Sequence, residues 1–167
     1  LGGGVYLVSS SPTFTNLLIT NNTASSSGGG VYVTSTNTLP EPSYSRPSFT
    51  DVTISNNTAV RGAGMHTQNA SPLLTRVVFS GNNATSGAGG GMHNTVLSST
   101  DARSIPVLID VTFTGNTANG GGGLFNGYSN PNLDRVTFNS NTANRRGGGM
   151  LNENSSPTLT NVTFHGN

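Results

Sequence analysis

The sequence contains no cysteine and no lysine, and charged residues of both signs make up only 8% of it. Without cysteine, disulfide bonds and thiolate metal sites are excluded. The formal net charge of +1 provides no electrostatic footprint, so we expect neither nucleic acid nor an anionic membrane as a partner. No apolar run approaches the roughly 20 residues of a membrane-spanning helix, and we therefore expect no membrane insertion.

Low charge and abundant polar residues are also typical of disordered chains, but the apolar residues of this sequence recur at regular places. Solubility must come from serine, threonine and asparagine, because typical globular domains carry about 25% charged residues. With 167 residues the chain is long enough for one domain with a continuous core. We interpret it as ordered.

A repeat fills the chain from one end to the other. A glycine-rich triplet starts at Gly2, Gly28, Gly62, Gly89, Gly121 and Gly147, and three positions later stand Val5, Val31, Met65, Met92, Leu124 and Met150. Each copy then reaches a proline at Pro12, Pro47, Pro72, Pro106, Pro131 or Pro157. Seven residues after the proline stands Ile19, Ile54, Phe79, Phe113, Phe138 or Phe164, and an asparagine follows three residues later. A fixed period of this size predicts a solenoid.

The spacing within each copy predicts short strands. Apolar and polar residues alternate after the glycines, as in Val31-Tyr32-Val33, and again after the proline, as at Val162 and Phe164. No segment shows a helical period, so each strand must pair with the equivalent strand of the next copy. We therefore expect an all-β fold, a right-handed parallel β-helix of about six coils that occupies residues 1–167 as a single domain.

The distances between triplets are 26, 34, 27, 32 and 26 residues, and most of the variation lies between the glycines and the proline. The additional residues, around 38–46 and 98–104, predict two loop insertions at one corner of the coil. Because the sequence begins inside a repeat and shows no obvious cap at either terminus, we expect a fragment or protomer of a longer solenoid or fibre.

Stacking of equivalent residues predicts both the core and one corner. We expect one core column of Phe14, Phe49, Leu74, Leu108, Leu133 and Leu159, a second of Leu17, Val52, Val77, Val111, Val136 and Val162, and a third made by the isoleucines and phenylalanines already named. At the corner we expect a structural asparagine ladder of Asn22, Asn57, Asn82, Asn116, Asn141 and Asn167.

Two of these motifs resemble those of a known family. Gly147-Gly148-Gly149-Met150 and Phe164-His165-Gly166-Asn167 are similar to the Gly-Gly-Ala-aliphatic and Phe-x-x-Asn motifs of chlamydial polymorphic outer membrane proteins and related β-helix adhesins. All six repeats share the likeness, although isoleucine replaces phenylalanine twice. The resemblance implies a β-helix that serves as an adhesive element at the cell surface.

Catalytic chemistry on this fold would require clustered carboxylates, as in polysaccharide lyases and glycosidases. The sequence has only Glu41, Asp51, Asp101, Asp110, Asp134 and Glu153. Four residues after the prolines we expect one outward column that contains Asn16, Asp51, Arg76, Asp110, Arg135 and Asn161. The alternating charges favour ion pairs between coils, so we predict no catalytic, cofactor-binding or metal-binding residues and no enzyme.

One residue after each aliphatic position, a second outward column is expected to form a candidate contact stripe. Its members are Tyr6, Tyr32, His66, His93, Phe125 and Leu151. Such a stripe could stack on sugar rings, pack on a neighbouring chain or be covered by a loop, and stacking between coils that only stabilises the sheet is an equal alternative. His66 and His93 lack a third ligand in their column, which argues against a metal site.

Six sequons of the form Asn-x-Ser/Thr make the chain a candidate glycoprotein. They begin at Asn21, Asn56, Asn69, Asn83, Asn154 and Asn161.

Together these features predict an extracellular or cell-surface structural and adhesive element that associates with itself along the solenoid axis or continues into neighbouring coils. A glycan is a further possible partner. The alternative functions are a carbohydrate-binding or polysaccharide-degrading β-helix similar to pectate lyase and, less favoured, an ice-binding solenoid, whose outward threonine columns would be interrupted here by Leu18 and Val78.

Overall fold

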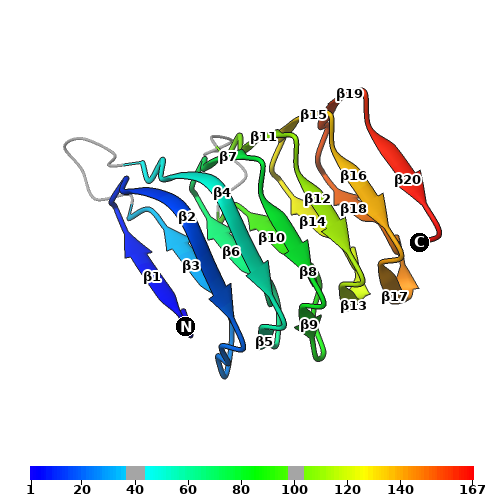
Figure 1. Ribbon diagram of the computed structural model, residues 1–167, viewed down its shortest axis with the longest axis horizontal. Helices are drawn as coiled ribbons and strands as arrows, with labels where there is room; N and C mark the ends of the chain where they lie inside the picture. The colour runs from blue at the N-terminus through cyan, green and yellow to red at the C-terminus, as the bar shows by residue number, and fades with distance from the viewer. Residues whose placement is uncertain (37–43, 98–103) are drawn as a thin grey trace.

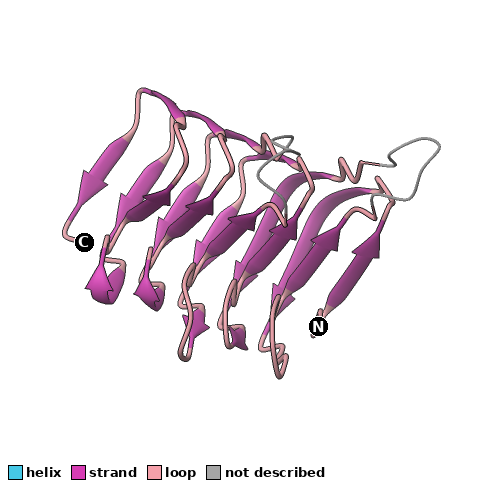
Figure 2. Cartoon of the chain, turned by 180° about the vertical axis from the view of Figure 1, so that it is seen from behind, coloured by secondary structure: helices cyan, strands magenta, loops and turns pink. Residues whose placement is uncertain are grey.

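The computed structural model describes residues 1–36, 44–97 and 104–167, and every regular element in these parts is a β-strand. The strands follow one another in successive coils, and the N- and C-termini lie at opposite ends of the row (Figure 1). The view from behind shows the same succession of coils, with strands on both sides and no helix (Figure 2).

The described strands form three sheets, each made of equivalent segments from successive coils. Sheet A follows the glycine triplets and contains β1 (Val5–Val8), β3 (Val31–Thr34), β6 (Met65–Gln68), β10 (Met92–Thr95), β14 (Leu124–Gly127) and β18 (Met150–Glu153). Sheet B follows the prolines and contains β2 (Thr13–Thr20), β4 (Ser48–Ser55), β7 (Leu73–Thr75), β8 (Val78–Ser80), β11 (Val107–Ile109), β12 (Thr112–Thr114), β15 (Asn132–Asp134), β16 (Thr137–Asn139), β19 (Thr158–Thr160) and β20 (Thr163–His165). Sheet C contains β5 (Thr58–Ala59), β9 (Asn83–Ala84), β13 (Thr117–Gly120) and β17 (Thr142–Arg146).

Each strand pairs in parallel with the equivalent strand of the next coil. Val5 lies opposite Val31, and Phe14 lies opposite Phe49, so that equivalent positions of the repeat share one register. The predicted parallel β-helix is therefore confirmed. The segments expected to contain the two insertions include residues 37–43 and 98–103, which lie outside the described residues, as do Glu41 and Asp101.

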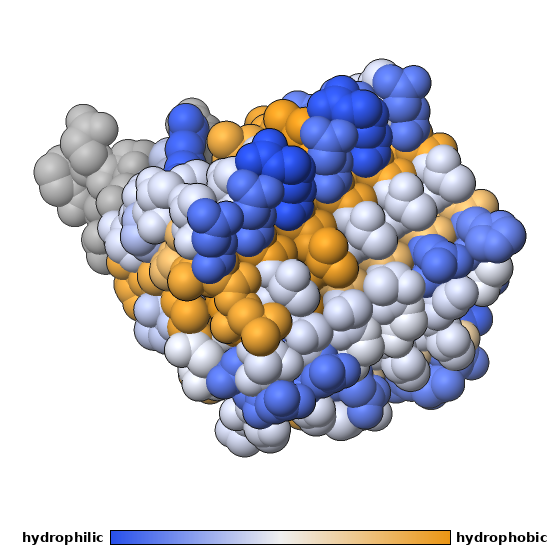
Figure 3. Space-filling model, viewed as in Figure 1, coloured by the Kyte–Doolittle hydropathy of each residue, from blue (hydrophilic) through white to orange (hydrophobic). Residues whose placement is uncertain are grey.

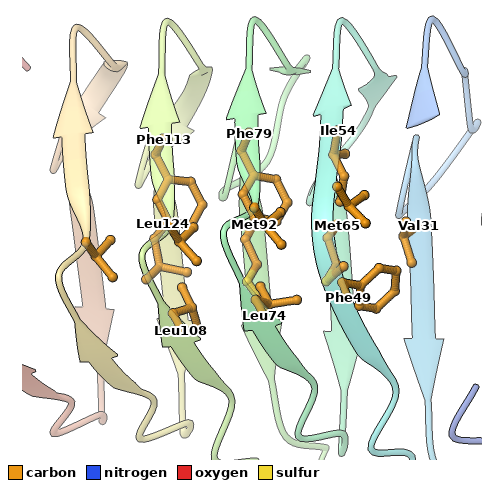
Figure 4. Packing of buried hydrophobic residues seen from close by; sticks show 14 of the residues in the cluster. Val31, Phe49, Ile54, Met65, Leu74, Phe79, Met92, Leu108, Phe113 and Leu124 are labelled. Atoms are coloured by element: carbon orange, nitrogen blue, oxygen red, sulfur yellow. The ribbon is translucent and has the colours of Figure 1, made fainter. Parts of the chain in front are cut away.

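The core is made of columns that run along the axis, and Figure 4 shows three of them as rows of side chains from successive coils. The rings of Phe79, Phe113 and Phe138 lie one over the next with centroid separations of 4.8 and 4.9 Å. All three side chains are completely buried. Leu74 and Leu108 pair in the next column, as the sequence predicts.

The glycine triplet is required by this packing. A Cβ atom on Gly91 would lie 2.6 Å from the ring of Phe113, and one on Gly123 would lie 2.8 Å from the ring of Phe138. The third glycine of the triplet therefore lets the backbone of sheet A rest directly on the phenylalanine column. The glycine triplet and the phenylalanine of the Phe-x-x-Asn motif are thus in direct contact, although they belong to different parts of the repeat.

Two features of the coil differ from the prediction of two strands. Sheet C is a third strand position, placed directly after the ladder asparagines and marked in sequence only by an alanine such as Ala59. The residue four positions after the proline has a positive φ in every coil, for example 51° at Arg76 and 53° at Arg135, and in all but the first two coils sheet B is divided there into two strands. The division separates β7 from β8 and leaves the apolar residue that follows the positive-φ residue, such as Val77, directed into the core.

Candidate functional site

The outward column of sheet A is a continuous stack of rings. From Tyr6 through Tyr32, His66 and His93 to Phe125, successive centroids lie 5.3, 5.1, 4.6 and 4.5 Å apart. Leu151 pairs with Phe125 and completes the column.

Most of this column is covered, so the expected exposed contact stripe is wrong for four of its six positions. Tyr32, His66, His93 and Phe125 are only 4–9% exposed, whereas Tyr6 is 49% exposed. These four side chains do point outward from sheet A, but a second layer of backbone lies over them.

The covering layer is the segment that precedes each glycine triplet. The first glycine of the triplet has a positive φ, 69° at Gly89, and turns the chain back over the column. A Cβ atom on Gly89 would lie 2.7 Å from the Cβ of His93, and the carbonyl oxygen of Ala88 accepts a 3.0 Å hydrogen bond from His93 Nδ1. A signal for this cover exists in the sequence, because a glycine stands four residues before every member of the column.

Burial makes the two histidines poor bases. Removal from water lowers the pKa of His93 to about 4 and lowers the pKa of His66 well below its ordinary value, and the positive charge of Arg61 adds to both effects. His66 Nδ1 is buried without a hydrogen-bond partner in the described structure. Both rings are therefore neutral in the folded chain at neutral pH.

The six asparagines of the expected ladder lie over one another at the corner between sheets B and C. The backbone N–H and the Nδ2 of each asparagine both donate to Oδ1 of the next, as from Asn82 to Asn116 at 3.0 and 2.9 Å. The same geometry joins every neighbouring pair from Asn22 to Asn167. Asn116 Nδ2 also donates to the carbonyl oxygen of Phe79 at 3.0 Å. The ladder thus satisfies backbone groups that the turn would leave unpaired.

Sequence reasoning missed a second row of amides, which lies inside the solenoid. Thr67, Asn94 and Asn126 are completely buried. Thr67 Oγ1 donates to Asn94 Oδ1 at 2.6 Å, Asn94 Nδ2 donates to Asn126 Oδ1 at 2.9 Å, and Asn126 Nδ2 donates to Asn152 Oδ1 at 2.8 Å. All four residues stand five positions after the start of a triplet, so the common spacing could have predicted the row.

The outward charged column of sheet B contains ion pairs between neighbouring coils. Arg76 Nε lies 2.6 Å from Asp51 Oδ1, and Arg135 Nε lies 2.6 Å from Asp110 Oδ1. These hydrogen bonds hold the pKa of both carboxyl groups below the usual range. Arg135 also contacts Asp134. Each of these carboxylates is therefore bound by an arginine. The described residues include no group of three or more histidine, cysteine, aspartate or glutamate side chains that could hold a metal ion.

The sequon asparagines differ in accessibility. Asn21, Asn56, Asn83, Asn154 and Asn161 are exposed. Asn69 is only 7% exposed, and its Oδ1 accepts a 3.0 Å hydrogen bond from the backbone N–H of Leu97. Asn69 is therefore a wrong candidate for glycosylation, because its side-chain amide is buried and hydrogen-bonded in the folded chain.

A hollow opens beside the aromatic column, against the covering layer. It has a volume of about 340 Å³, and its lining includes Ala88, Gly120, Phe125, Arg146 and Leu151. Arg145 also belongs to the lining, and within the described residues neither Arg145 nor Arg146 is in an ion pair.

The comparisons with known proteins concern the repeat. Residues 16–34 and 110–127 match the family model for the Chlamydia polymorphic membrane protein repeat. Both segments begin at the positive-φ residue of sheet B, cross the asparagine ladder and the glycine corner, and end with a strand of sheet A. These two segments are similar to the polymorphic membrane protein repeat.

The resemblance expected from the triplets and the Phe-x-x-Asn motifs is thereby confirmed in these two segments. No curated protein and no solved structure matches the chain. Within the described residues, no helix is long and apolar enough to cross a membrane.

The ladder makes a prediction about stability. Asn116→Ala removes four hydrogen bonds and leaves the backbone N–H of Asn82 buried without its partner, at a cost of about 1–3 kcal/mol for that group alone. Urea denaturation should show a large loss of unfolding free energy. The exposed Asn132→Ala provides the control and should change stability little; equal losses in the two variants would contradict the role of the ladder.

The buried histidines predict acid sensitivity. An unfolded histidine binds a proton as the pH falls below about 6.5, while His93 in the folded chain does so only near 4, so stability should decrease between these values. Asp51 and Asp110 remain ionised across this range, because their pKa values lie below the ordinary one. The decrease should appear in melting temperatures measured from pH 7 to pH 4.5.

A variant with His66→Phe and His93→Phe keeps aromatic rings in the column and should remove most of this pH dependence. His165→Phe, at an exposed position, serves as the control. A wild-type melting temperature that stays constant over the range would refute the prediction.

Proposed function

We propose that the chain is a structural and adhesive element exposed outside the cell or on its surface, where stacked coils present a rigid and weakly charged face. The observation that supports this most directly is the match of two coils to the polymorphic membrane protein repeat, which is the repeat of a surface-protein family. The stacked columns add a physical reason, since a solenoid with both a side-chain ladder and a packed core resists bending and local unfolding.

The arrangement of acidic groups favours this role over polysaccharide degradation. Acid–base hydrolysis of a glycoside needs two carboxyl groups about 5–10 Å apart across a substrate cleft. Asp51 and Asp110 lie on the outer face of sheet B and are each held by an arginine of the adjacent coil. The face itself carries rows of similar hydropathy that run across the coils (Figure 3).

We further propose that the chain associates along its axis, with an equivalent coil of a second copy or of a longer chain. Phe164 is 48% exposed, although its equivalent Phe138 is completely buried under the next coil. At the other end, Leu17 is 42% exposed, whereas its partner Val52 is only 1% exposed. Each end therefore presents open strand edges around an apolar cross-section, which another coil of the same kind would cover.

Surface exposure can be tested on the organism that makes the protein. An antibody against the 167-residue chain should label intact cells, and protease added outside should remove the signal. A cytoplasmic marker protein provides the control for cell integrity. Labelling that appears only after the cells are made permeable would contradict the proposed location.

Axial association predicts that the purified chain forms elongated oligomers as its concentration rises. Phe164→Lys places a charge on the open end and should shift sedimentation toward the monomer. Leu97→Lys, at a lateral position that is 73% exposed, should leave assembly unchanged. If the wild type stays monomeric throughout, or if both variants act alike, the axial proposal is wrong.

A further inference from the structure

The hollow beside the aromatic column is built from exceptions to the repeat. Equivalent positions of the covering layer hold Ser27, Arg61, Ala88, Gly120 and Arg146 in consecutive coils. The two smallest residues, Ala88 and Gly120, are neighbours in this row, and both line the hollow together with Phe125 and Leu151. The result is an opening with an apolar floor and an arginine of the same row on each side of the gap.

Positive charge is concentrated at one rim. Strand β17 contains one more residue than β13 between its alanine and the glycine corner, and the register shifts there, so that Gly120 pairs with Arg146. An additional residue of this kind changes the direction in which the neighbouring side chains point relative to the regular strand pairing. Arg145 and Arg146 both line the hollow, both are exposed, and neither is in an ion pair within the described parts of the chain.

The wall between the coils is held in place by amides. Asn144 Nδ2 donates to Asn119 Oδ1 at 3.1 Å, and Asn119 Nδ2 donates to the carbonyl oxygen of Ser86 at 2.7 Å. Asn119 and Ser86 are part of the lining. A ligand would therefore meet a wall that is already ordered, which reduces the entropy cost of binding.

We infer that this hollow binds an acidic sugar unit of a carbohydrate, with the acid group on Arg145 and Arg146 and the apolar side of the ring over Phe125 and Leu151. The inference rests on the proposed adhesive function and names a ligand class for it. Planar guanidinium groups bind carboxylate and sulfate in a two-pronged geometry, so both kinds of acid group fit the rim. Glu153 contributes one negative charge to the lining, which leaves two arginines against one carboxylate.

Size and exposure also favour a sugar. A volume of about 340 Å³ is at the lower end of the range of small-molecule sites, roughly 300–1,000 Å³. Phe125 is only 9% exposed, which offers an apolar edge for C–H contacts and no free ring face on which a nucleic acid base could stack. The formal net charge of +1 adds no wider basic surface that would attract a nucleic acid.

Binding can be measured by titration calorimetry on the 167-residue chain with three polysaccharides. Polygalacturonate carries carboxylates, heparin carries sulfates as well, and dextran is neutral. Polygalacturonate, heparin or both should bind with an affinity that falls as salt is added, and dextran should not bind. The difference between the two acidic polymers shows which acid group is preferred.

Variants locate the site. Arg145→Gln and Arg146→Gln should each weaken binding about tenfold or more, because each removes a charge-assisted contact. Arg46→Gln removes the same charge from an exposed position elsewhere and should not change the affinity. Ala88→Leu fills the hollow without altering charge and should also abolish binding, while melting temperatures verify that each variant is folded.

Three outcomes would overturn the inference: no binding of either acidic polymer, equal losses in Arg46→Gln and the two rim variants, or equally tight binding of a single-stranded oligonucleotide. None of them affects the proposed surface location, which is tested independently by labelling of intact cells. Loss of surface labelling together with retained polymer binding would instead contradict the proposed function alone.

Discussion

Hydrogen bonding between equivalent residues of successive coils is the constraint on which the rest of this structure depends. Once the backbone of one coil pairs in register with the next, every side chain has a neighbour of the same repeat position about 4.8 Å away. A position can then hold only residues that stack well on themselves. Phenylalanine rings, branched aliphatic side chains and asparagine amides all meet this condition, and each of these kinds of residue forms a column in the coil.

The same constraint explains why the glycines are as regular as the core. The first glycine of a triplet, such as Gly89, turns the chain back onto the aromatic column, and the third, such as Gly91, allows a phenylalanine ring to lie on the backbone. A side chain at either position would push neighbouring layers apart in two places at once. The spacing between glycine and phenylalanine motifs is therefore a packing requirement that acts across the coil.

The parallel β-helix, its core columns and the asparagine ladder could be predicted because their residues repeat at fixed intervals with little exception. The cover over His66 and His93 could not be predicted from alternation alone, since alternation tells which side of a sheet a residue faces and not whether a second layer lies beyond it. Sheet C was missed because strands as short as Thr58–Ala59 leave almost no pattern. The inner amide row was missed because Asn94 and Asn126 face the core, where polar residues are normally excluded.

The asparagine ladder has a direction. In every step from Asn22 to Asn167 the donors belong to the earlier coil and the accepting oxygen to the later one. One end of the row consequently presents an oxygen acceptor and the other presents N–H donors, so two copies that met with identical ends would bring like groups together. Any filament formed by continuing this row must be polar, with every subunit pointing the same way and two chemically distinct tips at which growth and capping can be controlled separately.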